Sequence, residues 1–185
     1  MSAKRLCVFC GASMPAETAY REAATVLGAA IGQAGLELVY GGGRVGMMGL
    51  VADAALAAGA PVIGVIPTGL HNKEIAHAGV SNLVVVPDMQ ERKRQLFALS
   101  DAVAVLPGGL GTLDEAFEAI TLRQLGFLQK PIVLVDTLEY WRPLLALVDR
   151  VIASGFAQPD AARLYEVVSR AEEVIPACFG KDFRP

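Results

Sequence analysis

Charged and aromatic residues are scarce in this chain of 185 residues, at 19% and 6% of the sequence. The net charge of −3 lacks the excess of basic residues that marks a nucleic-acid-binding protein, so we expect no nucleic-acid partner. The longest apolar runs fall short of the roughly 18 residues that a membrane-spanning helix needs. We therefore expect no membrane association.

Cysteine and histidine are also rare, with three and two residues. Cys7 and Cys10 have the C-x-x-C spacing of redox motifs, but residues three apart on a strand point to opposite faces. We expect both to be structural thiols in a reducing compartment, the cytoplasm. No cluster has the spacing of zinc ligands, and His71 and His77 are expected to be surface-loop residues, so we predict no metal.

Apolar runs alternate with helical patterns along the whole chain. Helical spacing covers residues 16–34, 48–58, 88–100, 113–125 and 140–154, and strands are expected at 5–9, 36–40, 62–66, 83–86, 102–106 and 132–135. Strands that are apolar on both faces and joined by helices indicate a parallel sheet. The length suits one domain, 1–185. The sequence thus predicts a single doubly wound, Rossmann-like α/β domain with helices on both faces, and a tail of one short helix and a loose end from Glu166.

Ligands of such folds bind beyond the carboxyl ends of the strands. Four loops rich in glycine or polar residues fall there, at 10–13, 41–46, 67–73 and 107–112. The second contains G-x-G-x-x-G, a dinucleotide fingerprint, but it follows the second strand and the next strand ends without an acidic residue for a ribose. A nicotinamide-dependent oxidoreductase is therefore a disfavoured alternative.

The segment from Leu106 to Glu118 is the most informative. Three glycines follow the fifth strand within four residues, and a threonine and acidic residues then open a helix. Glycines let a backbone approach a ligand closely, and the free N–H groups of a helix start suit a phosphate. Glu115 lies one turn further on. Acidic residues in that position also favour the helix dipole, so composition alone leaves the role of Glu115 open.

Arg92, Lys93 and Arg94 lie together in the helix expected after the fourth strand. Helical spacing predicts that Glu91, Arg94 and Gln95 face solvent while Arg92 points to the strand ends. A solvated run of charges is the alternative interpretation. We expect the fourth strand to neighbour the glycine-rich strand in the sheet, which favours a functional role.

Two motifs together, Met89-x-Glu-Arg-Lys and Pro-Gly-Gly-Leu-Gly-Thr-Leu-Asp-Glu ending at Glu115, closely resemble those of the LOG ("Lonely Guy") phosphoribohydrolases. The resemblance also includes Cys-Gly-Ala-Ser from Cys10 and Val-Tyr-Gly-Gly-Gly from Val39, and it covers roughly residues 5 to 180. The chain departs from the family at Gln90, where many relatives have His, and at Ala12, where serine is common.

The resemblance implies a hydrolase that cleaves the N-glycosidic bond of AMP or N6-substituted AMP and needs no cofactor. It implies that Glu115 and Arg92 are catalytic. It also implies a homodimer whose site lies near the interface, for which the helix at 113–125 is a candidate. The substrate-binding positions implied are Ser13, Gly42, Gly43, Glu74, Lys93, Gly108, Gly109, Leu110, Gly111, Thr112 and Thr121.

Two other functions follow from the same family context. Related Rossmann-like proteins bind nucleotides or carry the molybdenum cofactor without hydrolysis, but such a carrier would need neither Arg92 nor Glu115. Many similar sequences are labelled lysine decarboxylases. A pyridoxal-phosphate enzyme needs a buried lysine for its Schiff base. No lysine of this chain lies in a recognisable context of that kind.

Overall fold

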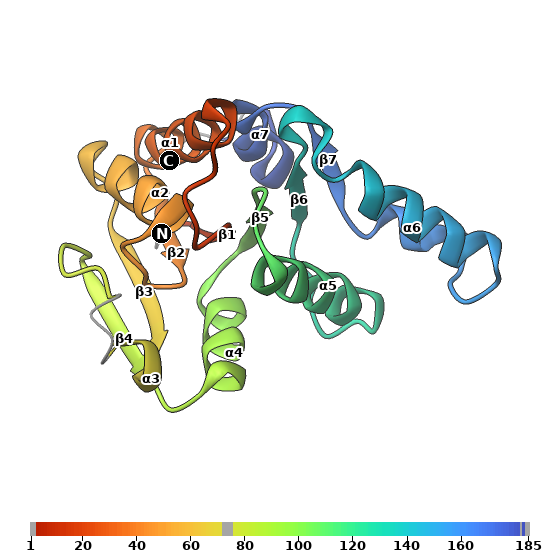
Figure 1. Ribbon diagram of the computed structural model, residues 1–185, viewed down its shortest axis with the longest axis horizontal. Coiled ribbons are helices and arrows are strands. Elements are labelled where there is room, and N and C mark those ends of the chain that lie inside the picture. The colour runs from red at the N-terminus through yellow and green to blue at the C-terminus, as the bar shows by residue number, and fades with distance from the viewer. Residues whose placement is uncertain (1–2, 72–75, 182, 184–185) are drawn as a thin grey trace.

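Seven parallel strands form the centre of the computed structural model, which describes residues 3–71, 76–181 and 183 (Figure 1). The sheet order is β4-β3-β2-β1-β5-β6-β7. The strands are β1 (Arg5–Phe9), β2 (Glu37–Tyr40), β3 (Val62–Pro67), β4 (Asn82–Val86), β5 (Ala102–Val105), β6 (Ile132–Val135) and β7 (Glu166–Val168). The predicted doubly wound α/β fold is confirmed.

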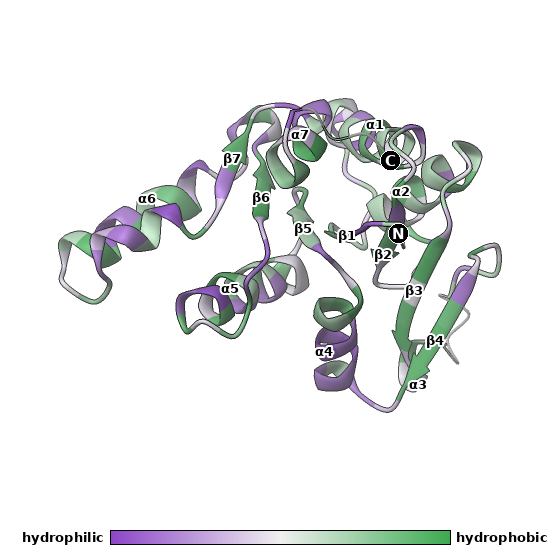
Figure 2. Ribbon diagram, turned by 180° about the vertical axis from the view of Figure 1, so that it is seen from behind, coloured by the Kyte–Doolittle hydropathy of each residue, from purple (hydrophilic) through white to green (hydrophobic). Residues whose placement is uncertain are grey.

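Helices cover both faces of this sheet. One face carries α1 (Thr18–Gln33), α2 (Gly46–Ala57) and α7 (Val174–Phe179), and the other carries α4 (Met89–Leu99), α5 (Leu110–Gln124) and α6 (Arg142–Ala153). A short helix, α3 (Thr68–His71), follows β3. The strands are mostly hydrophobic, whereas α4 and α6 carry hydrophilic stretches (Figure 2). Within the described residues, no helix has the length and apolar character to cross a membrane.

Side-chain alternation along the strands divides the core into two layers. Leu6 and Val8 of β1 belong to the layer beneath α1 and α2, while Cys7 and Phe9 belong to the layer that packs against α4 and α5. Cys10 belongs to the first layer and Cys7 to the second. The prediction that these two cysteines face opposite ways is confirmed, and both are free thiols.

The direction of winding reverses between β1 and β5. Strands β1 to β4 are added successively toward one edge, and α4 then crosses back so that β5 pairs with β1. The expectation that the fourth strand neighbours the glycine-rich strand is wrong, because β3, β2 and β1 lie between them. The return crossing of α4, not strand adjacency, brings Arg92 to the glycine-rich loop.

Two further boundaries differ from those predicted. The expected loose tail contains β7, whose three residues pair with β6 and are too few to show an alternating pattern. Helix α5 begins at Leu110, three residues early, because Gly109 takes the N-cap position and Gly111 and Thr112 already adopt helical geometry. Three residues that were expected in the loop, 110–112, therefore belong to the first helical turn.

Candidate active site

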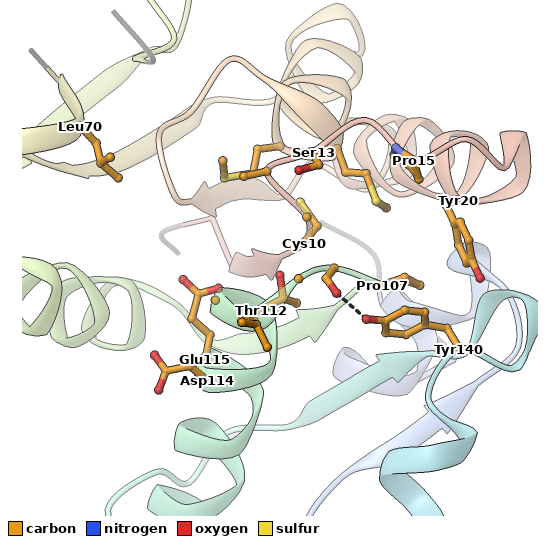
Figure 3. A pocket seen from close by; sticks show the side chains of 18 of the residues that line it. Cys10, Ser13, Pro15, Tyr20, Leu70, Pro107, Thr112, Asp114, Glu115 and Tyr140 are labelled. Carbon is orange, nitrogen blue, oxygen red and sulfur yellow. Dashed lines mark hydrogen bonds between the residues drawn. The ribbon is translucent and has the colours of Figure 1, made fainter. Parts of the chain in front are cut away.

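A pocket of about 500 Å³ lies at the point where the winding reverses, as the fold class predicts (Figure 3). Its walls come from the ends of β1 and β5, the starts of α2, α4 and α5, α1 and the segment before α6. The lining residues are Cys10, Gly11, Ala12, Ser13, Pro15, Tyr20, Met47, Met48, Leu70, Met89, Arg92, Pro107, Gly108, Gly109, Leu110, Gly111, Thr112, Asp114, Glu115 and Tyr140.

Arg92 is the most constrained charged side chain of the pocket. Its Nη1 donates to Oε1 of Glu115 at 2.9 Å, its Nε donates to the Val65 carbonyl at 3.1 Å, and its Nη2 lies 3.4 Å from the Gly41 carbonyl. One guanidinium thus joins α4 to α5, to β3 and to the loop after β2. Arg94, two residues on, is 77% exposed and pairs with Glu91. The predicted facing of this helix is confirmed for Arg92 and Arg94.

Gly41 lies directly against the Arg92 guanidinium. A Cβ placed there would lie 1.9 Å from Nη2 of Arg92 and 3.2 Å from the sulfur of Met48. The absence of a side chain therefore leaves room for the guanidinium. Of the G-x-G-x-x-G segment, Gly41 approaches Arg92, and none of its three motif glycines is among the residues found to line the pocket.

Glu115 is almost fully buried, and its surroundings have opposite effects on its pKa. Burial raises the pKa of this carboxyl to about 7, although the Arg92 guanidinium acts to lower it. A carboxyl that titrates near neutrality can accept a proton from a water molecule or return one at physiological pH. Its neighbour Asp114 points away from Glu115 (Figure 3).

The glycine-rich segment turns the start of α5 toward the pocket. Gly109 is the N-cap, and Leu110, Gly111 and Thr112 form the first turn, whose N–H groups have no carbonyl one turn before them. The positive end of the helix dipole lies at the same place. All of these residues line the pocket, so a phosphate there would meet several donors.

Lys93 is buried but does not line the pocket. Its Nζ donates to Oδ2 of Asp114 at 3.0 Å and also pairs with Glu118. Burial acts to lower the pKa of Lys93, but these two carboxylates outweigh it and raise the pKa. The ammonium therefore remains charged and ties α4 to α5 beside the Arg92–Glu115 pair.

Of the residues predicted to form the site, some line the pocket and others lie outside it. The pocket brings together Arg92 and Glu115 with Ser13, Gly108, Gly109, Leu110, Gly111 and Thr112. Thr121 is exposed on the outer face of α5. Gly42 accepts a backbone hydrogen bond from His77, and Gly43 bridges to Ala76, both outside the pocket lining. Glu74 lies outside the described residues.

The His77 side chain is largely buried and has a partner at each ring nitrogen. Its Nε2 lies 2.9 Å from Oδ1 of Asp53, and its Nδ1 accepts from the Gly79 N–H.

The prediction that no metal is bound rests on sequence spacing. Among the residues the structure describes, no group of three or more His, Cys, Asp or Glu side chains is arranged to hold a metal ion.

Sequence reasoning missed Tyr20 and Tyr140. Tyr140 follows β6, which pairs with β5 on the side away from β1, so its loop reaches the same edge of the sheet as the glycine-rich segment. The rule that ligands bind beyond the strand ends would have found it, had it been applied to the sixth strand. Of the two departures from the LOG pattern, Ala12 lines the pocket and Gln90 does not.

Cys10 also lines the pocket. Burial raises the pKa of its thiol, and the negative charge of Glu115 raises it further. The thiol therefore stays neutral at physiological pH, so it is unsuited to act as a nucleophile.

Comparison with known sequences gives two results. The family model described as "Possible lysine decarboxylase" matches residues 48–178. The chain is 43% identical over 171 residues to the probable cytokinin riboside 5'-monophosphate phosphoribohydrolase LOGL1 of Oryza sativa subsp. japonica, covering 92% of the chain and 77% of that protein. It is 40% identical over 180 residues to the cytokinin riboside 5'-monophosphate phosphoribohydrolase LOG1 of Arabidopsis thaliana, covering 94% of the chain and 84% of that protein.

Among solved structures, the fold matches the molybdenum cofactor binding protein of Rippkaea orientalis with a TM-score of 0.71 at 25% identity, over 95% of this chain and 94% of that one. It matches the molybdenum cofactor carrier protein MCP of Chlamydomonas reinhardtii with a TM-score of 0.73 at 22% identity, over 95% and 96%. The second likeness shows a shared fold alone.

Proposed function

The chain belongs to the LOG family of phosphoribohydrolases, and from that premise we propose that it hydrolyses the N-glycosidic bond of AMP or N6-substituted AMP. The products are a free purine base and ribose 5-phosphate. The observation that carries this proposal is the buried Arg92–Glu115 pair at the rim of a helix start suited to phosphate. A nucleotide carrier needs the helix start but has no need of the pair.

In the proposed mechanism Glu115 acts on the ribose. Cleavage of a glycosidic bond develops positive charge on the sugar in an oxocarbenium-like transition state. The Glu115 carboxylate stabilises that charge and orients or deprotonates the attacking water. Arg92 holds Oε1 of Glu115 and places the substrate.

The 5'-phosphate lies at the start of α5 in this proposal. The N–H groups of residues 109–112 and the Thr112 hydroxyl hold it, and Ser13 faces it from the loop after β1. Glu115 lies five residues beyond Leu110, or about 7.5 Å along the helix axis. That separation suits a ribose held by its phosphate at one end and attacked at its glycosidic carbon.

The base occupies the apolar part of the pocket. Met48, Leu70 and Met89 line it, and flexible thioethers adapt to ligands of different shape. These residues give an N6 substituent an apolar surface, which supports N6-substituted AMP as a substrate.

A homodimer completes the proposal. Leu110, Phe117 and Leu125 are exposed apolar residues of α5 and the position after it, and Leu110 is 85% exposed while lining the pocket. Thr121 shares this outer face. Because Thr121 does not line its own pocket, its implied role in substrate binding requires the face to meet a second copy. Phe117→Asp should then convert the dimer to a monomer in sedimentation velocity.

The other implied features remain part of the proposal. Free cysteines accord with a cytoplasmic location, and the acidic net charge accords with the absence of a nucleic-acid partner. Gly42 and Gly43 support the site by shaping the loop that receives Arg92, and Glu74 and Lys93 are further substrate-binding candidates.

Pyridoxal phosphate does not fit this pocket. A decarboxylase of that class forms a Schiff base with a lysine, and no lysine is among the residues found to line the pocket. Lys93 is paired with two carboxylates, and Lys130 donates to the carbonyls of Phe97 and Ser100. The family description as a possible lysine decarboxylase therefore has no support at this site.

Incubation of the pure protein with AMP and with isopentenyl-AMP tests the proposal. Chromatography should show free base accumulating with many turnovers per chain. Tight binding of either nucleotide without base release would instead support the carrier function.

A further inference from the structure

The connection between β6 and α6 holds two adjacent non-glycine residues in the left-handed region, Leu138 at φ 54° and Glu139 at φ 57°. This conformation is unfavourable for residues with a Cβ and persists only where surrounding contacts impose it. Asp136 makes hydrogen bonds on both sides of this connection. Its Oδ1 accepts from the Trp141 N–H at 2.6 Å, and its own N–H donates to the Val168 carbonyl at 2.8 Å.

This connection places Tyr140 next to the glycine-rich segment. The Tyr140 ring is fixed between two aromatic neighbours, with edge-to-face contacts to Tyr20 at 6.1 Å and to the buried Trp141 at 4.9 Å between ring centroids. Its hydroxyl donates to the Gly108 carbonyl (Figure 3). The ring therefore has little freedom to leave that carbonyl.

The hydrogen bond determines what Tyr140 can do. A phenol has one proton, and this one is engaged by Gly108. The oxygen has only lone pairs left for a phosphate, and lone pairs repel an anion. Tyr140 is thus unsuited to bind the phosphate directly and can act only through Gly108.

Fixing one carbonyl fixes the adjacent N–H. The C=O of Gly108 and the N–H of Gly109 belong to one planar trans peptide and point in opposite directions. Gly109 is the N-cap of α5. On its other flank Thr112 and Gly11 leave no room for a side chain, because a Cβ at Gly108 would lie 2.2 Å from Oγ1 of Thr112 and 2.7 Å from the Gly11 nitrogen, so the peptide has close neighbours on both sides.

We propose that Tyr140 is a positioning residue, which orients the Gly108–Gly109 peptide so that the start of α5 is preorganised for a sugar phosphate before the ligand arrives. The inference rests on the proposed function for the identity of the ligand. Preorganisation of this kind lowers the ordering cost of binding.

The test is Tyr140→Phe, which keeps the ring and removes the hydroxyl, with Tyr165→Phe outside the pocket as the matched control. With AMP, Tyr140→Phe should raise KM roughly three- to tenfold, the equivalent of one neutral hydrogen bond, and leave kcat nearly unchanged. With adenosine, which lacks the phosphate, kcat/KM should stay at the wild-type value. A merely structural role would lower kcat/KM equally for both substrates, and that result would overturn the proposal.

A binding measurement separates this proposal from the proposed function. Titration calorimetry with ribose 5-phosphate should give a Kd raised by the same factor in Tyr140→Phe and unchanged in Tyr165→Phe. If the wild type binds ribose 5-phosphate but releases no base, the hydrolase function fails while the ratio of Kd values still decides the role of Tyr140. An unchanged Kd in Tyr140→Phe, or no binding of ribose 5-phosphate by the wild type, would refute the role of Tyr140.

Discussion

The Nη1 atom of Arg92 lies 2.9 Å from Oε1 of Glu115, and less than a tenth of either side chain is exposed. A buried ion pair is weak evidence for stability, because removing two charges from water costs much of what their attraction returns. At the rim of a pocket, the same arrangement fixes a carboxylate whose pKa is about 7. We therefore expect changes to this pair to affect catalysis first.

Glu115→Gln should abolish base release while leaving nucleotide binding largely intact. Glutamine keeps the shape of the side chain but loses its charge, and loss of one such electrostatic group costs on the order of a hundredfold or more in rate. Single-turnover kinetics and AMP titration measure the two quantities separately. Glu22→Gln, an exposed change on α1, is the control. Near-normal turnover of Glu115→Gln would remove this residue from the mechanism.

Arg92→Ala should lose activity by on the order of a hundredfold or more, whereas Arg94→Ala should stay within about twofold of the wild type. The two residues lie about 200° apart on the helix, and only Arg92 reaches the pocket. Steady-state kinetics with AMP compare the two variants. Damage confined to Arg94→Ala would mean that the exposed face of α4 binds the substrate.

Gly41→Ala should act at a distance through Arg92. The added methyl group would occupy the position of Nη2, so the guanidinium must move and release Glu115. We expect kcat to fall by on the order of a hundredfold with the fold retained, since misplacing a catalytic group by about 1 Å has effects of this size. Gly69→Ala has open space around its Cβ and serves as the control. Wild-type activity in Gly41→Ala would show that Arg92 need not occupy its observed position.

The pH dependence of kcat/KM should report the ionisation of Glu115. The active form is the carboxylate, so kcat/KM should rise with pH and level off above about 7. Asp114 acts to raise this pKa by its charge, so Asp114→Asn should move the rising limb to lower pH. A limb due to the substrate phosphate, whose second pKa is near 6, would not move. Rate profiles between pH 5 and 9 for the two proteins decide the matter.

The sequence predicted the elements of the fold better than their spatial relations. Continuous apolar runs identified the six longer strands, but nothing in the pattern placed β4 at the sheet edge or showed that α4 crosses back to β5. Helical spacing alone was enough to turn Arg92 inward and Arg94 outward. The three hydrogen bonds of the Arg92 guanidinium could not be predicted from the sequence. Two of the acceptors are the backbone carbonyls of Val65 and Gly41, and every residue carries such a carbonyl.

The family motifs located the pocket but not the function of each position in it. Lys93 matched a substrate-binding position, yet it pairs with Asp114 and Glu118 behind the pocket wall. Tyr140 belongs to none of the family motifs. Its position depends on the two preceding residues in the left-handed region, and no side-chain pattern indicates that conformation. The one signal that the sequence offered for Tyr140 was its position shortly after the end of the sixth strand.

A complete product balance on AMP tests the central claim most directly. Wild-type protein should convert AMP to adenine and ribose 5-phosphate in equal amounts, with no adenosine and no inorganic phosphate, and Glu115→Gln should form neither product at a comparable rate. Formation of adenosine and inorganic phosphate would show cleavage of the wrong bond, and unchanged AMP after prolonged incubation would show that the site binds without hydrolysing. Either result would contradict N-glycosidic hydrolysis by the Arg92–Glu115 pair.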